Sequence, residues 1–129
     1  MLIIDLNTFA LDSKYEILNE KDELQYWSQP DFAYKKRVHI YDNKDNELGY
    51  VQYKILSCQD GATFFNKEDK DIDLSDLKII NIKGDWQFDI EDVASINVEV
   101  KKIMIDIVDE HKIDKCLLFI YSLFGKEND

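Results

Sequence analysis

The segment VHIYDNKDNELGYVQYK, residues 38–54, has the pattern of a β-hairpin and occurs earlier in a weaker form. Val38 and Ile40 alternate with other side chains, as in a half-buried strand, before the polar turn DNKDNE. The earlier copy, YEILNEKDELQYW at residues 15–27, alternates Tyr15 and Ile17 before NEKDE. A lone hairpin with one apolar face is only marginally stable, so two in succession predict a larger antiparallel sheet that closes or stacks.

The two copies align at an offset of 23 residues, which places Ile17 on Ile40. One inserted residue then places Leu24 on Leu48 and Tyr26 on Tyr50. If the repeat is structural, Ile17 and Ile40 should be buried alike; coincidental similarity over a short span is the alternative.

Two further runs of alternating apolar residues follow the repeat, Ile96/Val98/Val100 and Ile103/Ile105/Ile107, and the phase slips at Lys101-Lys102. These two lysines lack the Gly or Asn that tight hairpin turns favour, so we expect a bulge or corner in one long strand rather than a reversal. The segment FNKEDKDIDLSDL, residues 65–77, lies between the repeat and these runs. It alternates acids with lysines and is expected to form a long exposed loop.

The C-terminal run CLLFIYSLF, residues 116–124, is apolar on every side except at Ser122. Asp109 or Asp114 can cap a helix start and Gly125 can end it. The run is too short to span a bilayer, which needs about 20 residues. We therefore predict a buried helix over residues 113–124, with a buried last β-strand as the alternative.

Length and composition indicate one folded domain, residues 1–129, with 45% hydrophobic residues and a formal charge of −11. This charge disfavours binding to nucleic acid and to anionic lipid surfaces. Cys58 and Cys116 form no CxxC motif, and the N-terminus lacks the basic start of a signal peptide. A cytoplasmic location with reduced thiols is expected.

The order of these segments resembles one known family. FALDSKYEILNEKDELQYW, FAYKKRVHIYDNKDNELGYVQYKILS, IKGDW and KIMIDIVDEHKIDKCLLFIYSLF follow one another as in the tubby C-terminal-like superfamily, specifically its LURP-one-related branch and small bacterial members. The resemblance implies a closed or nearly closed antiparallel β-barrel around a buried hydrophobic C-terminal helix. The chain is shorter than the family pattern between Trp86 and Lys102, so either one hairpin is expected to be reduced or the barrel to be incompletely closed. Relatives bind phosphoinositides or act at membranes, but their lipid-binding residues match no positions here.

No residue set in the sequence points to catalysis, a cofactor or a metal ion. Two acidic loops, starting at Asp42 and Asp69, lack the Gly and the closing Glu of a calcium loop. His39 and His111 lie far apart, without the spacing of a zinc pair or a recognisable triad. We therefore expect a protein that is not an enzyme.

Lys35, Lys36 and Arg37 form the one run of three basic residues and are the candidate ligand-binding residues, for an anion. Arginine can grip a phosphate or carboxylate through two parallel hydrogen bonds, although solubilising charge at a strand edge is the alternative. An aromatic set could line a pocket or serve packing. Its members are Tyr26, Trp27, Tyr50 and Tyr53.

Two functions remain open on the sequence. The first is a non-enzymatic cytoplasmic binding or scaffold module of the tubby-like type, with an unknown ligand and a possible protein partner. The second is an acidic inhibitor or immunity-type protein that caps a basic partner. For either function, weak or no binding to membrane lipids is expected.

Overall fold

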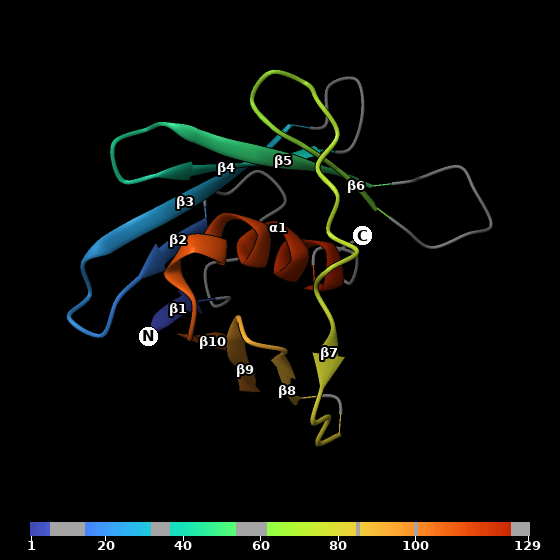
Figure 1. Cartoon of the computed structure of the whole chain (residues 1–129). Helices are drawn as coiled ribbons and strands as arrows, with labels where there is room; N and C mark the ends of the chain where they lie inside the picture. Colours follow the sequence, from blue (N-terminus) through green and yellow to red (C-terminus); the bar gives the residue numbers. More distant parts are fainter. Residues whose placement is uncertain (6–14, 32–36, 54–61, 85, 100, 125–129) are drawn as a thin grey trace.

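The computed structural model describes residues 1–5, 15–31, 37–53, 62–84, 86–99 and 101–124. These residues form a ten-stranded antiparallel sheet and one α-helix (Figure 1). The strands are β1 (Leu2–Asp5), β2 (Tyr15–Leu18), β3 (Leu24–Asp31), β4 (Arg37–Asp42), β5 (Glu47–Tyr53), β6 (Ala62–Phe65), β7 (Ile79–Ile80), β8 (Gln87–Ile90), β9 (Ala94–Glu99) and β10 (Lys102–Ile107). A 3-10 turn, η1 (Glu110–Lys112), precedes the helix α1 (Ile113–Phe124).

The sheet has the strand order β6-β5-β4-β3-β2-β1-β10-β9-β8-β7, so β1 joins an N-terminal half to a C-terminal half. Figure 1 shows the two halves on opposite sides of α1, with the sheet curved around the helix. The mainly antiparallel β fold with one C-terminal helix is thus as predicted. The predicted closure into a barrel is not observed, because among the described residues β6 and β7 are the ends of the sheet and do not pair.

Helix α1 has the bounds that the sequence predicts, and the alternative of a last β-strand is excluded. Its inward side chains lie within the curved sheet, with Cys116 and Leu117 fully buried and Leu118 1% exposed. The Asp109 side chain accepts a hydrogen bond from His111 N–H and caps η1, as one of the two expected capping residues. No helix in the described part of the chain is long and apolar enough to cross a membrane.

Two polar contacts attach α1 to the sheet inside the apolar core. The hydroxyl oxygens of Ser28 and Tyr121 are 2.8 Å apart, and Ser28 is fully buried. Tyr53 donates its hydroxyl hydrogen to the Tyr121 carbonyl oxygen at 2.7 Å. Buried hydroxyl groups need such partners, because leaving one unpaired costs about 1–3 kcal/mol.

The predicted repeat is structural. β2–β3 and β4–β5 are both antiparallel hairpins, and both Ile17 and Ile40 are 0% exposed. Each hairpin also has a register shift directly after that isoleucine. The predicted one-residue insertion is wrong: Ile17 pairs with Tyr26 and Ile40 with Gly49, so the same offset continues through the second strands.

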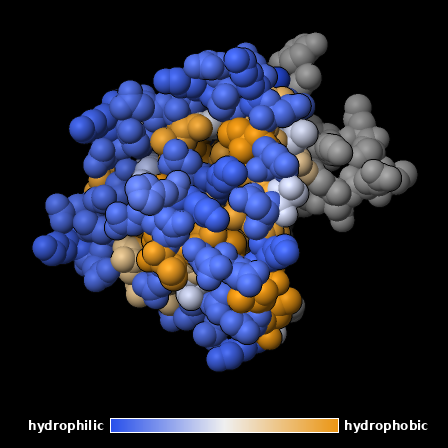
Figure 2. All heavy atoms as spheres, viewed as in Figure 1, coloured by the Kyte–Doolittle hydropathy of each residue, from blue (hydrophilic) through white to orange (hydrophobic). Residues whose placement is uncertain are grey.

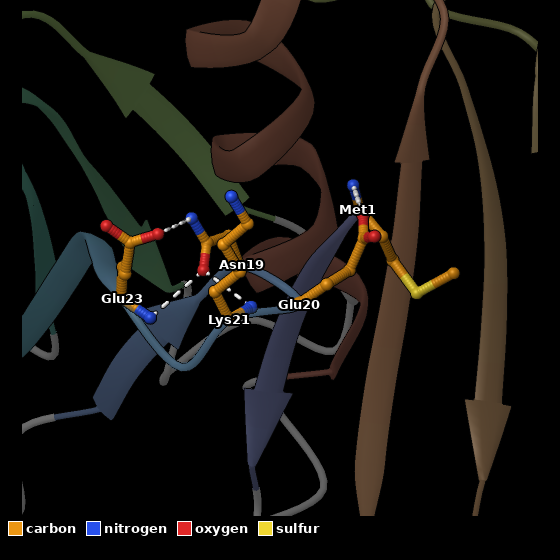
Figure 3. A network of polar contacts seen from close by, with 5 residues as sticks. All are labelled: Met1, Asn19, Glu20, Lys21 and Glu23. Carbon is orange, nitrogen blue, oxygen red and sulfur yellow. Dashed lines mark hydrogen bonds and ion pairs between the residues drawn. The ribbon is translucent and has the colours of Figure 1, made fainter.

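The turns of the two hairpins share one hydrogen-bond pattern. In the first, the Asn19 side-chain oxygen accepts from the N–H groups of Lys21 and Glu23 at 2.9 and 3.0 Å (Figure 3). In the second, Asp42 accepts in the same way from Lys44 and Asn46, both at 2.9 Å. The fourth residue of each turn is an aspartate with positive φ, Asp22 at 61° and Asp45 at 66°. Asp and Asn tolerate this left-handed conformation better than most residues.

A third copy of the turn follows β6 and was missed in the sequence. Asn66 accepts from Glu68 and Lys70 N–H at 2.9 and 3.0 Å, and Asp69 has a φ of 62°. Its second strand is reduced to a bridge between Phe65 and Asp71. The shared signal is Asn or Asp followed three residues later by Asp, in NEKDE, DNKDN and NKEDK.

Acid is expected to weaken the second turn selectively, because Asp42 alone fills the capping position with a carboxylate. Hydrogen bonds from Asn46 and Lys44 N–H lower the pKa of Asp42. A lowered folded-state pKa stabilises the fold above the unfolded-state pKa, about 3.9, and this stabilisation is lost as pH falls through the folded value. Asp42→Asn keeps a capping oxygen, as Asn19 and Asn66 do, but does not titrate.

Urea unfolding of wild type and Asp42→Asn at about pH 6 and about pH 3 tests this expectation. The stability advantage of the wild type should shrink at the lower pH. An advantage that is the same at both pH values contradicts it.

The prediction of one long strand around Lys101-Lys102 is wrong. β9 and β10 form an antiparallel hairpin in which Glu99 pairs with Lys102. This reversal places Ile96 opposite Ile105 and Val98 opposite Ile103. The phase slip in the sequence therefore marks a change of strand, with Ile96, Val98, Ile103 and Ile105 buried on the inner face.

The segment between β6 and β7 is not the fully exposed loop that the sequence predicts. Its acidic and lysine side chains are exposed, but Leu74 and Leu77 are both only 7% exposed. Figure 1 shows this segment passing between the two ends of the sheet, beside α1. These leucines cover part of the core where the sheet does not close. Hydrophobic patches still reach the surface between hydrophilic side chains on this side of the molecule (Figure 2).

Candidate functional site: an aromatic strip on the outer face of the sheet

The outer faces of the two halves of the sheet differ in chemistry. In the C-terminal half, the outward positions of β9 and β10 are mainly polar, and include Ser95, Asn97, Glu99, Lys102 and Asp106. In the N-terminal half, the outward positions of β3 to β6 carry a set that we call the outer aromatic strip. It consists of Trp27, Arg37, His39, Tyr41, Tyr50 and Phe65.

The strip is built from two equivalent contacts between successive hairpins. Trp27 stacks on Tyr41 with ring centroids 4.2 Å apart, and its indole N–H donates to Asp45 at 2.9 Å. Tyr50 stacks on Phe65 at 5.0 Å, and its hydroxyl donates to Asp69 at 2.8 Å.

The corrected alignment explains this equivalence. Trp27 and Tyr50 occupy the same repeat position, and each bonds to the positive-φ aspartate of the next turn. One consequence is structural: each hairpin is attached to its neighbour on the solvent side of the sheet. Offset stacking contributes about 0.5–1.5 kcal/mol beyond burial.

His39 lies between the two stacked pairs, and Arg37 lies beyond it on β4, opposite Asp31 and Gln52. The Arg37 guanidinium lies 5.0 Å from the centre of the Tyr50 ring, and its Nε–H donates to Gln52 at 3.0 Å. The His39 ring lies 4.9 Å from Tyr50, and its Nδ1 contacts the Glu47 carboxylate. Both side chains are therefore already positioned by partners within the strip.

Burial and nearby carboxylates affect the tyrosines of the strip. Burial raises the pKa of Tyr41, with a further increase from the charges of Glu47 and Asp31. Burial and the hydrogen bond to Asp69 raise the pKa of Tyr50, although Arg37 opposes this shift. Both side chains therefore remain neutral hydrogen-bonding aromatics at neutral pH.

The structure places one of the three candidate anion ligands. Arg37 lies in the strip, whereas Lys35 and Lys36 fall outside the described residues. The predicted aromatic set divides between two faces: Trp27 and Tyr50 face outward, while Tyr53 reaches the core side of α1. Tyr26 packs against the core as the partner of Ile17. These four residues therefore do not line one pocket.

Sequence reasoning missed Tyr41 and Phe65 as site residues. Tyr41 directly precedes Asp42, and Phe65 directly precedes Asn66, the first residues of their turns. Recognising the third copy of the turn in the sequence would have shown that these two aromatic residues occupy the same position. His39 faces outward from β4, opposite Gln29 and Tyr50. These residues can be recognised as one strip only when the register between neighbouring strands is known.

The described residues contain no cluster of three or more His, Cys, Asp or Glu side chains suited to a metal ion. The Asp42 carboxylate accepts hydrogen bonds within its own turn, and Asp69 accepts one from Tyr50. Burial raises the pKa of the Cys116 thiol to about 12, so it is not a reactive thiolate. Cys58 lies outside the described residues.

A concave region lies beside β6, where the sheet is open. It has a volume of about 420 Å³ and is bordered by Phe64, Ile72 and Phe119, among others. Thr63, Asp71, Asp73 and Ser75 also border this region, which opens widely to solvent.

Comparisons with known proteins add no relative on which a function can be based: no family model matches the chain, and searches of curated proteins and of solved structures find no similar protein.

Proposed function

We propose that this chain is a non-enzymatic protein-binding module that contacts its partner through the outer aromatic strip. The observation that carries the proposal is the difference between the two outer faces of one sheet. A solvated face of an antiparallel sheet is normally polar, as in β9 and β10, but β3 to β6 present aromatic, histidine and arginine side chains there. Aromatic residues and arginine are enriched in the energetically important parts of protein interfaces.

The proposal includes a tubby-like relationship and a cytoplasmic location. A sheet that curves around a hydrophobic C-terminal helix supports the relationship. A fully closed barrel would need pairing between β6 and β7, which the described strands do not make. An acidic protein that caps a basic partner is the second candidate, and the carboxylates beside the strip favour it.

The function is tested by capture followed by direct titration. The immobilised wild-type chain captures proteins from an extract of its native cells, and each captured protein is then purified and titrated by calorimetry. Trp27→Ala combined with Tyr41→Ala should weaken binding of at least one partner by about tenfold or more, as expected for interface aromatics.

The matched control is Ile82→Ala combined with Trp86→Ala, which removes two side chains that are 67% and 61% exposed in the connection between β7 and β8. This variant should bind like the wild type, and circular dichroism should show that both variants are folded. Equal affinities of the wild type and the strip variant for every captured protein would contradict the proposal.

A further inference from the structure

We infer that the partner of the outer aromatic strip is an extended basic protein segment whose cationic side chains are four residues apart. The inference rests on the proposed function and specifies its partner. It begins with one row of outward residues across four strands. The register pairs Glu16 with Trp27, Trp27 with Tyr41 and Tyr41 with Glu47, so an aromatic pair lies between two carboxylates.

Three further carboxylates lie on or beside this face. Asp45 and Asp69 lie at the turns beside the strip, and Asp31 pairs with Arg37 at the opposite end of the strands. Arg37 is the one lysine or arginine among the described outward residues of β2 to β6, and its guanidinium already lies over Tyr50. The face therefore adds negative potential to a chain whose net charge is −11.

This chemistry selects a cationic partner over a neutral or acidic one. Covering this row with neutral surface would desolvate the Glu16 carboxylate without compensation and would leave Glu47 only its contact with His39, and an acidic surface would repel both. A guanidinium instead pairs with a carboxylate through two hydrogen bonds and packs favourably against aromatic rings. Arginine is therefore the preferred cation in the partner.

The spacing follows from sheet geometry. Neighbouring strands are about 4.8 Å apart, so the row from β2 to β5 spans about 14 Å. An extended chain rises about 3.4 Å per residue, so side chains four residues apart lie about 14 Å from each other on the same face. A basic segment crossing the strands can thus place one cation at Glu16 and another at Glu47.

The experiment titrates the full chain with synthetic peptides at about 0.15 M salt, where charge attraction extends only about 8 Å. One peptide has arginine at every fourth position. A second has the same composition with its arginines adjacent, and a third replaces arginine with glutamate. Calorimetry measures the dissociation constant of each peptide for the wild type and two variants.

The strip variant combines Glu16→Gln with Glu47→Gln, which keeps a side-chain carbonyl beside His39. The matched control combines Glu91→Gln with Asp92→Asn, two exposed residues of the turn between β8 and β9, and changes the net charge equally. Circular dichroism and thermal unfolding check that both variants are folded.

The spaced arginine peptide should bind the wild type about tenfold or more tightly than it binds the strip variant, and the control variant should stay within about twofold of the wild type. It should also bind more tightly than the adjacent-arginine peptide, and the glutamate peptide should not bind. Equal weakening by both variants would overturn the inference, because net charge alone would then explain binding. Failure of the spaced peptide to bind would also overturn it, while a captured acidic or neutral partner would preserve the proposed function.

Discussion

Replacing Leu118 with alanine is expected to lower the free energy of unfolding by about 2–5 kcal/mol. Leu118 is 1% exposed and extends from α1 toward β5, where its Cδ1 atom lies 3.5 Å from the position that a Cβ atom would take at Gly49. Alanine would leave a cavity between the helix and the sheet, which surround this side chain on all sides. Domains are stable by only about 5–15 kcal/mol, so this loss is a large share of the total.

Urea unfolding followed by far-ultraviolet circular dichroism measures the effect. Lys115→Ala is the matched control on the same helix, since its side chain is 41% exposed and lies 3.7 Å from Asp76. Surface substitutions of this kind usually change stability by less than about 0.5 kcal/mol. Similar losses in both variants would show that α1 is not the central core element.

Several features of the fold could be predicted from hydrophobic pattern alone. The all-round apolar run at the C-terminus predicted α1 with its observed bounds, because a helix that is apolar on every side must be enclosed. Ile17 and Ile40 were correctly matched because the repeat preserves the alternation of their strands. Both predictions concern which side chains are buried, and the pattern of apolar residues along the sequence indicates this directly.

Features that depend on backbone geometry were predicted less well. The sequence favoured an insertion because it aligned Leu24 with Leu48 and Tyr26 with Tyr50, whereas the two turns are of equal length and Tyr26 matches Gly49. Likewise, Lys101-Lys102 lack the residues that mark common tight turns, and the reversal between β9 and β10 was missed. In the turns that follow β2, β4 and β6, an Asn or Asp side chain and a positive-φ aspartate determine the backbone geometry.

The candidate site required the register of the sheet. Trp27 and Tyr41 are far apart in sequence and become neighbours only through the pairing of β3 with β4. The same pairing, extended to β2 and β5, places Glu16 and Glu47 at opposite ends of their row. Of the three basic residues proposed from sequence as anion ligands, Arg37 alone is described in this site, and its guanidinium is held by Tyr50 and Gln52.

Replacing Gly49 with alanine is expected to cost about 2–4 kcal/mol, because two separate penalties combine. Gly49 has a φ of 152°, which a residue with a side chain rarely adopts. A Cβ atom there would also lie 2.5 Å from the backbone carbonyl oxygen of Phe65, so β6 would have to move away from β5. Because Phe65 stacks on Tyr50, this displacement should also disturb the outer aromatic strip.

Gly84→Ala separates the two penalties. Gly84 has a φ of 68°, but a Cβ atom there would meet no atom within 4 Å. Its replacement should therefore cost only the left-handed backbone strain, about 1–2 kcal/mol. Urea unfolding gives both losses, and near-ultraviolet circular dichroism reports the aromatic environment, which should change in Gly49→Ala and stay unchanged in Gly84→Ala. If the two variants lose equal stability and keep the same aromatic spectrum, the close approach of Gly49 to β6 does not determine the geometry of the strip.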